Sequence, residues 1–161
     1  DWCCLPRFDS PSIFAKILDT EKGGGFGIYP KEKFKVKQNY LDESCILITR
    51  FENKSSSFEI IDFMPRFQNE KGEYFAPPEI IRFVKPIKGN TRIKFEYDPK
   101  LEYAQGETSH QVKKNVIVSE VNHPKHDSLF LYTNLPQGQL INQEYHNLNE
   151  TLFFNISYNE K

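Results

Sequence analysis

Apolar and polar residues alternate with a period of two over much of this 161-residue chain. In TRIKFEYD, residues 91–98, every second side chain is apolar or aromatic, and TLFFNISY, residues 151–158, repeats the pattern. Successive side chains of a β-strand point to opposite faces of a sheet, so this period places one apolar face against a core. The sequence therefore predicts two strands with one buried face each.

Five shorter apolar runs predict further strands that are buried on both faces: residues 45–51, 57–63, 79–87, 115–121 and 128–134. Turn-forming residues separate these runs. KGNT, residues 88–91, predicts a tight hairpin between the strands on either side of it. GGGFGIYP predicts a glycine turn leading into a short strand, and not a phosphate site, because no Lys-Ser/Thr pair follows the glycines.

Helical patterning is almost absent. A short helical segment is expected only at residues 12–18, where Ile13, Ile17 and Leu18 share one side and Pro11 suits a first helical position. Many short strands with almost no helix predict an all-β fold, an antiparallel sandwich with at most one short helix near the N-terminus. At 18.9 kDa the chain is the size of one domain with one core, which we expect to cover residues 1–161.

Charge and cysteine content narrow the classes of partner. The net charge is -1 and the pI is near 6.5, so we expect neither a nucleic-acid nor a membrane partner. Cys3, Cys4 and Cys45 are odd in number and lack disulfide or zinc spacing. The cysteines favour a reducing, cytoplasmic compartment, with secretion as the alternative.

Catalytic and metal-binding motifs are missing from the sequence. It holds no nucleophile elbow, P-loop, HExxH or CxxC. His123 and His126 are three residues apart, but Pro124 disfavours a helical face between them, so no metal site and no cofactor are expected. Asp62 interrupts the apolar run IIDFMPRF, and a buried carboxylate there needs a partner. Arg66 or Arg7 is the expected partner, in a structural ion pair.

Carbohydrate binding is a class that the composition permits. Aromatic residues make up 14% of the chain, and flat aromatic rings stack on sugar rings. Four of these residues fall in the long connections of the expected sandwich: Tyr74, Phe75, Tyr103 and Tyr145. Long loops in a compact domain are usually functional, although loop aromatics also pack back onto their own domain.

The opening segment DWCCLPRFDSPSIFAKILD resembles the N-terminal signature of bacterial and archaeal proteins of glycoside hydrolase family 15. These are glucoamylase, glucodextranase and trehalase-like enzymes. The segments GGGFGIYP, NYLDESCILITRFE, IIDFMPRF and EIIRFVKPIKGNTRIKFEYDPKLEYAQ follow the order of the family's later motifs. The likeness is good over about the first two thirds of the chain and loose over the last third. Cys3 stands where the family more often has leucine.

The resemblance implies an N-terminal β-supersandwich joined to a separate catalytic (α/α)6 barrel. The general acid and general base of an inverting hydrolysis would then lie in the barrel, so no residue of this chain is expected to be catalytic. The parent would hydrolyse a terminal α-glucosidic bond in an oligo- or disaccharide of glucose, and this domain alone would be inactive. The choice among starch, dextran and trehalose is left open.

The role of this domain in the parent has more than one interpretation. Residues 5–12 are predicted to lie at the interface with the barrel, because Pro6 and Pro11 fix an irregular segment there. Within it, Arg7, Phe8, Asp9 and Ser10 are the candidates for a position close to substrate or to the interface. Phe8 and Phe14 would pack inward or against the barrel. Arg7 and Asp9 would pair with each other or with Asp62. The same segment would otherwise be an ordinary buried edge of the sandwich. The competing function is a non-catalytic module that binds glucan, and a parent whose barrel has lost its glutamates is a third possibility.

Overall fold

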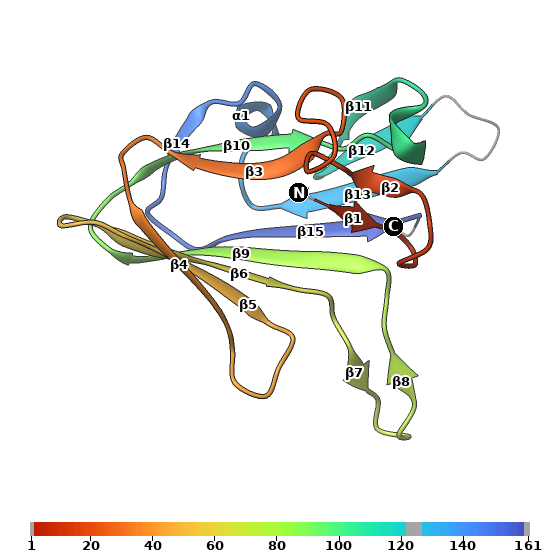
Figure 1. Ribbon diagram of the computed structural model, residues 1–161, viewed down its shortest axis with the longest axis horizontal. Coiled ribbons are helices and arrows are strands. Elements are labelled where there is room, and N and C mark those ends of the chain that lie inside the picture. Colours follow the sequence, from red (N-terminus) through yellow and green to blue (C-terminus); the bar gives the residue numbers. More distant parts are fainter. Residues whose placement is uncertain (1, 122–126, 160–161) are drawn as a thin grey trace.

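An eight-stranded antiparallel sheet forms the larger layer of the protein (Figure 1). The computed structural model describes residues 2–121 and 127–159. Across the sheet the strands follow the order β11-β12-β13-β15-β9-β6-β5-β4. Their bounds are β4 Lys35–Tyr40, β5 Leu47–Glu52, β6 Ser57–Phe63, β9 Glu79–Lys88, β11 Thr108–Lys113, β12 Val116–Val121, β13 Ser128–Thr133 and β15 Leu152–Tyr158.

A three-stranded antiparallel sheet packs on one face of the larger sheet. It consists of β3 (Gly25–Pro30), β10 (Arg92–Asp98) and β14 (Tyr145–Asn147), in the order β14-β10-β3. Phe154 on β15 is fully buried between the layers, with its ring centroid 5.2 Å from that of Phe26 on β3 and 4.8 Å from that of Phe95 on β10. The prediction of an all-β antiparallel sandwich is confirmed.

The two-residue period identifies the core faces of β10 and β15 correctly. Ile93, Phe95 and Tyr97 are buried on β10, and Leu152, Phe154 and Ile156 are buried on β15. β12 and β13 each contain three consecutive buried residues, as expected of strands covered on both faces. β5 and β9 are only partly buried, so the same expectation is wrong for those two strands.

The hairpin predicted at KGNT does not form. β9 pairs with β6 and β15 in the larger sheet, whereas β10 pairs with β3 and β14 in the smaller one. The turn therefore carries the chain from one layer to the other, and Gly89 takes a φ of +63° within it. Alternation shows which face of a strand is buried, but it does not show which sheet the strand joins.

The short helix lies near the C-terminal end of the chain and not at residues 12–18. Residues Ser12–Phe14 form strand β2, which pairs with β1 (Cys3–Cys4), and all three residues of β2 are buried. Consecutive buried residues suit a strand enclosed on both sides better than a one-sided helix. The helix α1 spans Gln137–Ile141, and a single 3-10 turn, η1, spans Glu102–Ala104. No helix among the described residues is long and apolar enough to cross a membrane.

The glycine run forms the predicted turn into β3. Gly24 has a φ of +63°, a region that side-chain-bearing residues rarely adopt. A Cβ atom at this position would also lie 2.2 Å from the carbonyl oxygen of Asp98. The glycine therefore allows the chain to pass directly against the end of β10.

Neighbouring phenylalanines on β15 provide a matched test of the core. We expect Phe154→Ala to lower the free energy of unfolding by about 3–5 kcal/mol, because it leaves a cavity between the sheets. Phe153→Ala changes the opposite face, where that side chain is 38% exposed, and should cost about 1 kcal/mol. Denaturant unfolding of both variants measures the difference, and equal losses would contradict the placement of the core.

Candidate functional site

The N-terminal segment forms a small two-stranded unit that packs on the core. A loop connects strands β1 and β2. Three residues buried in the core anchor this segment: Leu5, Ile13 and Phe14. At the top of the loop the backbone N–H of Ser10 donates to the carbonyl oxygen of Arg7 (3.1 Å). The Ser10 hydroxyl accepts in turn from the N–H of Arg7 (3.1 Å). These contacts fix residues 7–10 as a tight turn.

Arg7 pairs with Asp9 and not with Asp62. Nε of Arg7 lies 2.9 Å from Oδ1 of Asp9, and Nη2 reaches the other carboxylate oxygen. The hydrogen bonds from Arg7 hold the pKa of Asp9 below its usual value. Both side chains remain exposed to solvent, so this pair shapes the turn and adds little to stability.

Phe8 is 92% exposed at the tip of the same turn. Of the two phenylalanines predicted to pack inward or on another domain, only Phe14 packs inward. A phenyl ring that is almost fully exposed on a turn fixed by hydrogen bonds is available to a partner surface.

Asp62 forms the structural ion pair that its position in an apolar run predicts, but with Arg82. The two residues lie directly opposite each other in the pairing of β6 with β9. Nε of Arg82 donates to Oδ1 of Asp62 (2.6 Å) and Nη2 to Oδ2 (3.1 Å). The prediction of Arg66 as the partner is wrong: the Arg66 guanidinium lies over the ring of Tyr74, 5.4 Å from its centroid. Finding the true partner required the strand register, which the sequence leaves open.

A cleft of ≈ 280 Å³ lies beside this ion pair, between the N-terminal unit and the ends of β5, β6 and β9. Its walls include Trp2, Cys3, Tyr40, Met64 and Arg82. Burial raises the pKa of the Cys3 thiol to about 11, so this group is protonated at neutral pH and is a poor nucleophile. Arg82 and Asp62 satisfy each other, which leaves the cleft without an activated acid or base among the residues described.

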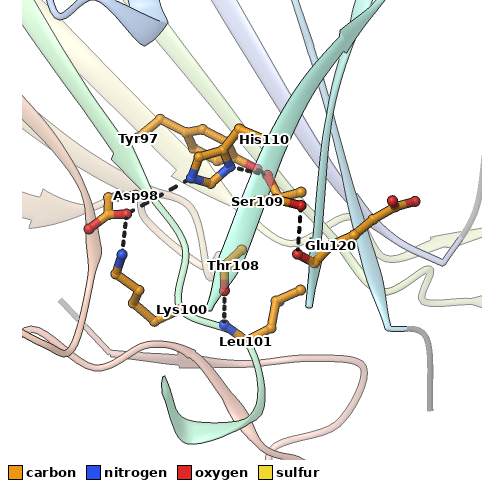
Figure 2. Close-up of polar contacts among 9 residues, drawn as sticks. Tyr97, Asp98, Lys100, Leu101, Thr108, Ser109, His110 and Glu120 are labelled. Carbon is orange, nitrogen blue, oxygen red and sulfur yellow. Dashed lines mark hydrogen bonds and ion pairs between the residues drawn. The ribbon is translucent and has the colours of Figure 1, made fainter. Parts of the chain in front are cut away.

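A second polar cluster lies between the sheets, where sequence reasoning had indicated nothing. Figure 2 shows His110 of β11 beside Tyr97 and Asp98 of β10. Nδ1 of His110 lies 3.0 Å from the hydroxyl of Ser119, and the Tyr97 hydroxyl lies 3.2 Å from the same oxygen. On the other side, Nε2 of His110 lies 4.0 Å from Asp98.

This order of serine, histidine and aspartate does not make a hydrolytic triad. Ser119 is fully buried, and the Tyr97 hydroxyl occupies the position in front of its oxygen. A nucleophile must reach substrate, and this one faces the core. The sequence signal for this cluster is the alternation of side chains along β11 and β12. In the pairing of these two strands, Ser119 lies directly opposite His110.

The described residues also contain no group of three or more side chains suited to hold a metal ion. His123 and His126 lie outside these residues.

The four loop aromatics do not form a common platform. Tyr74 and Phe75 belong to β8 (Tyr74–Phe75), Tyr103 to η1 and Tyr145 to β14, where the Arg92 guanidinium lies 5.6 Å from the ring centroid. Figure 1 shows β8 and β14 at opposite ends of the protein. All four rings are exposed, but a single sugar chain would not stack on all of them.

The sequence from Asp1 to Leu135 matches the family model described as "Trehalase-like, N-terminal". The chain belongs to this family. The match includes β1, β2, the turn at residues 7–10 and the Asp62–Arg82 pair, and it ends just before α1.

Curated relatives of this trehalase-like N-terminal chain are trehalases of archaea. The trehalase of Thermoplasma acidophilum is 39% identical over 107 residues, which is 65% of this chain and 18% of that protein. The trehalase of Thermoplasma volcanium is 35% identical over 108 residues, or 17% of its length. Trehalase 2 of Sulfolobus acidocaldarius is 49% identical over 65 residues, or 11% of its length. The chain thus spans less than a fifth of each of these relatives, and no solved structure matches it.

Removal of the Asp62 side chain should destabilise the fold, because the mostly buried Arg82 guanidinium then has no counter-charge. We expect Asp62→Ala to lower the free energy of unfolding by about 2–4 kcal/mol, somewhat below the roughly 3–5 kcal/mol of a fully buried pair. Arg66→Ala is the control, and its effect should be within about 0.5 kcal/mol. Denaturant unfolding measures both; a larger loss for Arg66→Ala would show that the pairing is different.

His110 should make folding depend on pH. Burial lowers the pKa of His110, although Asp98 partly opposes this effect. As the pH falls below about 6.5, the unfolded chain takes up a proton at this position before the folded chain does. The free energy of unfolding should therefore decrease between that pH and the lower pKa of the folded state. Unfolding curves measured at several pH values give the free energy of unfolding as a function of pH. This free energy should change less steeply with pH in His110→Gln than in the unchanged protein, and an equal dependence on pH would contradict the assignment.

Proposed function

We propose that this chain is the N-terminal β-sandwich domain of a glycoside hydrolase of family 15 and supports a separate catalytic barrel that hydrolyses a terminal α-glucosidic bond with inversion. The observation that carries the proposal is the match to the trehalase-like N-terminal family over residues 1–135. The relatives named trehalase support it, because each extends far beyond the length of this chain. Residues 1–161 would form one domain of that parent.

Trehalose is the substrate that we propose for the parent. Trehalases cleave the bond between two glucose units, and the relatives compared above carry that name. The acid and the base would both come from the barrel, where an inverting enzyme places two carboxyl groups roughly 6.5–9.5 Å apart. The candidate cleft of this domain is consistent with a supporting role, since its ion pair is already satisfied.

Within this proposal, the turn at residues 7–10 lies against the barrel close to substrate. Phe8 supplies an exposed ring, and the Arg7–Asp9 pair with the Ser10 hydroxyl holds the turn in shape. A contact loop of fixed shape loses little conformational entropy when its partner binds. The domain would thus shape the rim of the active site without taking part in the chemistry.

The second candidate function is a module that binds glucan without cleaving it. The observation in its favour is the exposure of Tyr74 and Tyr103. Calorimetric titration of the chain with trehalose and with maltooligosaccharides separates the two functions. Saturable binding that is lost in Tyr74→Ala or Tyr103→Ala would favour the module, and no binding would favour the supporting domain.

The cysteines support a cytoplasmic location in this proposal, because Cys3, Cys4 and Cys45 are all free thiols. Recovery of the protein in the soluble cell fraction with three thiols that can be alkylated after unfolding would agree with this location. Recovery in the culture medium would contradict it.

Phe8 provides the direct test of the proposed contact with the barrel. In the parent enzyme we expect Phe8→Ala to lower kcat/KM for trehalose roughly tenfold, which corresponds to about 1.4 kcal/mol. The control is Leu18→Ala, which removes an exposed apolar side chain outside the turn and should leave the kinetics unchanged. Unchanged kinetics together with an unchanged melting temperature in Phe8→Ala would refute the role of this turn.

A further inference from the structure

A second surface, formed by residues other than the turn at residues 7–10, exposes aromatic side chains on a projecting hairpin. Residues 64–78, here called the aromatic arm, leave the larger sheet after β6 and return to it at β9. The arm contains β7 (Phe67–Gln68) and β8, which pair with each other and with no other strand among the described residues. Figure 1 shows the arm projecting away from both sheets.

The arm exposes large apolar side chains. Phe67 is 54% exposed, Phe75 44% and Tyr74 70%, and Met64 at the base is also exposed. Phe67 and Phe75 lie opposite each other across the two strands and stack with a centroid distance of 5.6 Å. Contiguous exposed apolar surface of this kind marks an interaction site in a soluble protein. A two-stranded hairpin is also only marginally stable in water by itself.

The arm nevertheless has a well-defined shape. The side-chain oxygen of Asn69 accepts hydrogen bonds from the backbone N–H groups of Lys71 (3.0 Å) and Glu73 (2.9 Å). Gly72 takes a φ of +82° at the tip, and the Gln68 amide donates to its carbonyl oxygen (2.7 Å). Prolines occupy both ends of the arm, at positions 65, 77 and 78, and fix the backbone where it leaves the sheet. The arm is therefore preorganised for binding.

A groove of ≈ 610 Å³ lies at the base of the arm. Its lining is mostly apolar and includes Ile46, Phe63, Met64, Phe67 and Tyr74. Three of the arm's four charged residues, Glu70, Lys71 and Glu73, lie toward its tip. The fourth, Arg66, lines the groove, and the arm carries two positive and two negative charges in all. An apolar centre with a charged margin is the usual composition of a protein–protein interface, and it gives no reason to expect a nucleic acid or another strongly charged partner.

The course of the chain indicates which partner lies closest. The last residue of β15, Tyr158, donates its backbone N–H to the carbonyl oxygen of Pro78 at the base of the arm (3.2 Å). Any segment that follows this strand therefore starts beside the arm. The curated relatives are more than five times as long as the part that this chain matches. A partner linked at this point would be held at an effective concentration in the millimolar range.

We propose that the aromatic arm binds an apolar surface of the polypeptide that follows residue 161 in the parent protein, with a side chain of that segment filling the groove. This inference rests on the proposed function in one respect, namely that the parent continues into a second domain. The inference adds a second interface, formed by a different segment from the turn at residues 7–10.

Hydrogen exchange provides the test. Amide exchange in residues 64–78 is measured by mass spectrometry in the parent protein and in the 161-residue chain. We expect exchange in the arm to be at least tenfold slower in the parent. In the parent, the double variant Phe67→Ser, Tyr74→Ser should lose this protection, whereas the matched control Ile17→Ser, Leu18→Ser, also at exposed apolar positions, should retain it.

Each other outcome has a defined meaning. Equal exchange of the arm in the parent and in the chain would overturn the inference, whether or not the double variant folds. Protection that appears in the 161-residue chain and rises with its concentration would overturn it in favour of a second copy as the partner. Slow exchange of the arm in a parent that does not hydrolyse α-glucosides would refute the proposed activity but support the interface at the arm. The two proposals can therefore be refuted independently.

Discussion

The contact of Arg82 with Asp62 and Phe26 ties the two sheets together, and the architecture depends on it. Arg82 pairs with Asp62 across β9 and β6, donates through Nη1 to the carbonyl oxygen of Phe26 (2.8 Å), and places its guanidinium over the Phe26 ring. Phe26 in turn packs edge-to-face on Phe154 of the larger sheet. A mostly buried guanidinium has to satisfy its donors, so this arrangement favours both the register of β9 on β6 and the position of β3 beside them.

The same ion pair explains why the cleft beside it looks like a site but lacks catalytic character. Charged side chains in a cleft suggest acid–base chemistry, yet here the two charged groups are bound to each other in an ion pair. The cluster of His110, Ser119 and Tyr97 leads to a similar conclusion, since its hydroxyl groups face the core. Both polar clusters connect neighbouring strands and the two layers of the sandwich. This assignment agrees with a domain whose proposed work is to support chemistry done elsewhere.

In the two proposals above, the domain offers its partner two contact surfaces of fixed shape. The turn at residues 7–10 carries Phe8 and is held by Arg7, Asp9 and Ser10, whereas the aromatic arm is held by its own hydrogen bonds and terminal prolines. Exposed aromatic rings are costly in water, and their placement on rigid supports lowers the entropy lost on binding. Two separate surfaces would fix both the position and the orientation of a neighbouring domain.

The sequence alone determined the fold class, most of the strands and the family, because alternation and ordered motifs are local properties of the chain. It also identified Asp62 as a residue in need of a partner. The tertiary structure decided that this partner is Arg82, that KGNT crosses between layers, that residues 12–14 form a strand, and that Arg7 pairs with Asp9. Those outcomes depend on strand register and on the assignment of strands to sheets. Both are set by contacts between residues far apart in the chain, which no local pattern encodes.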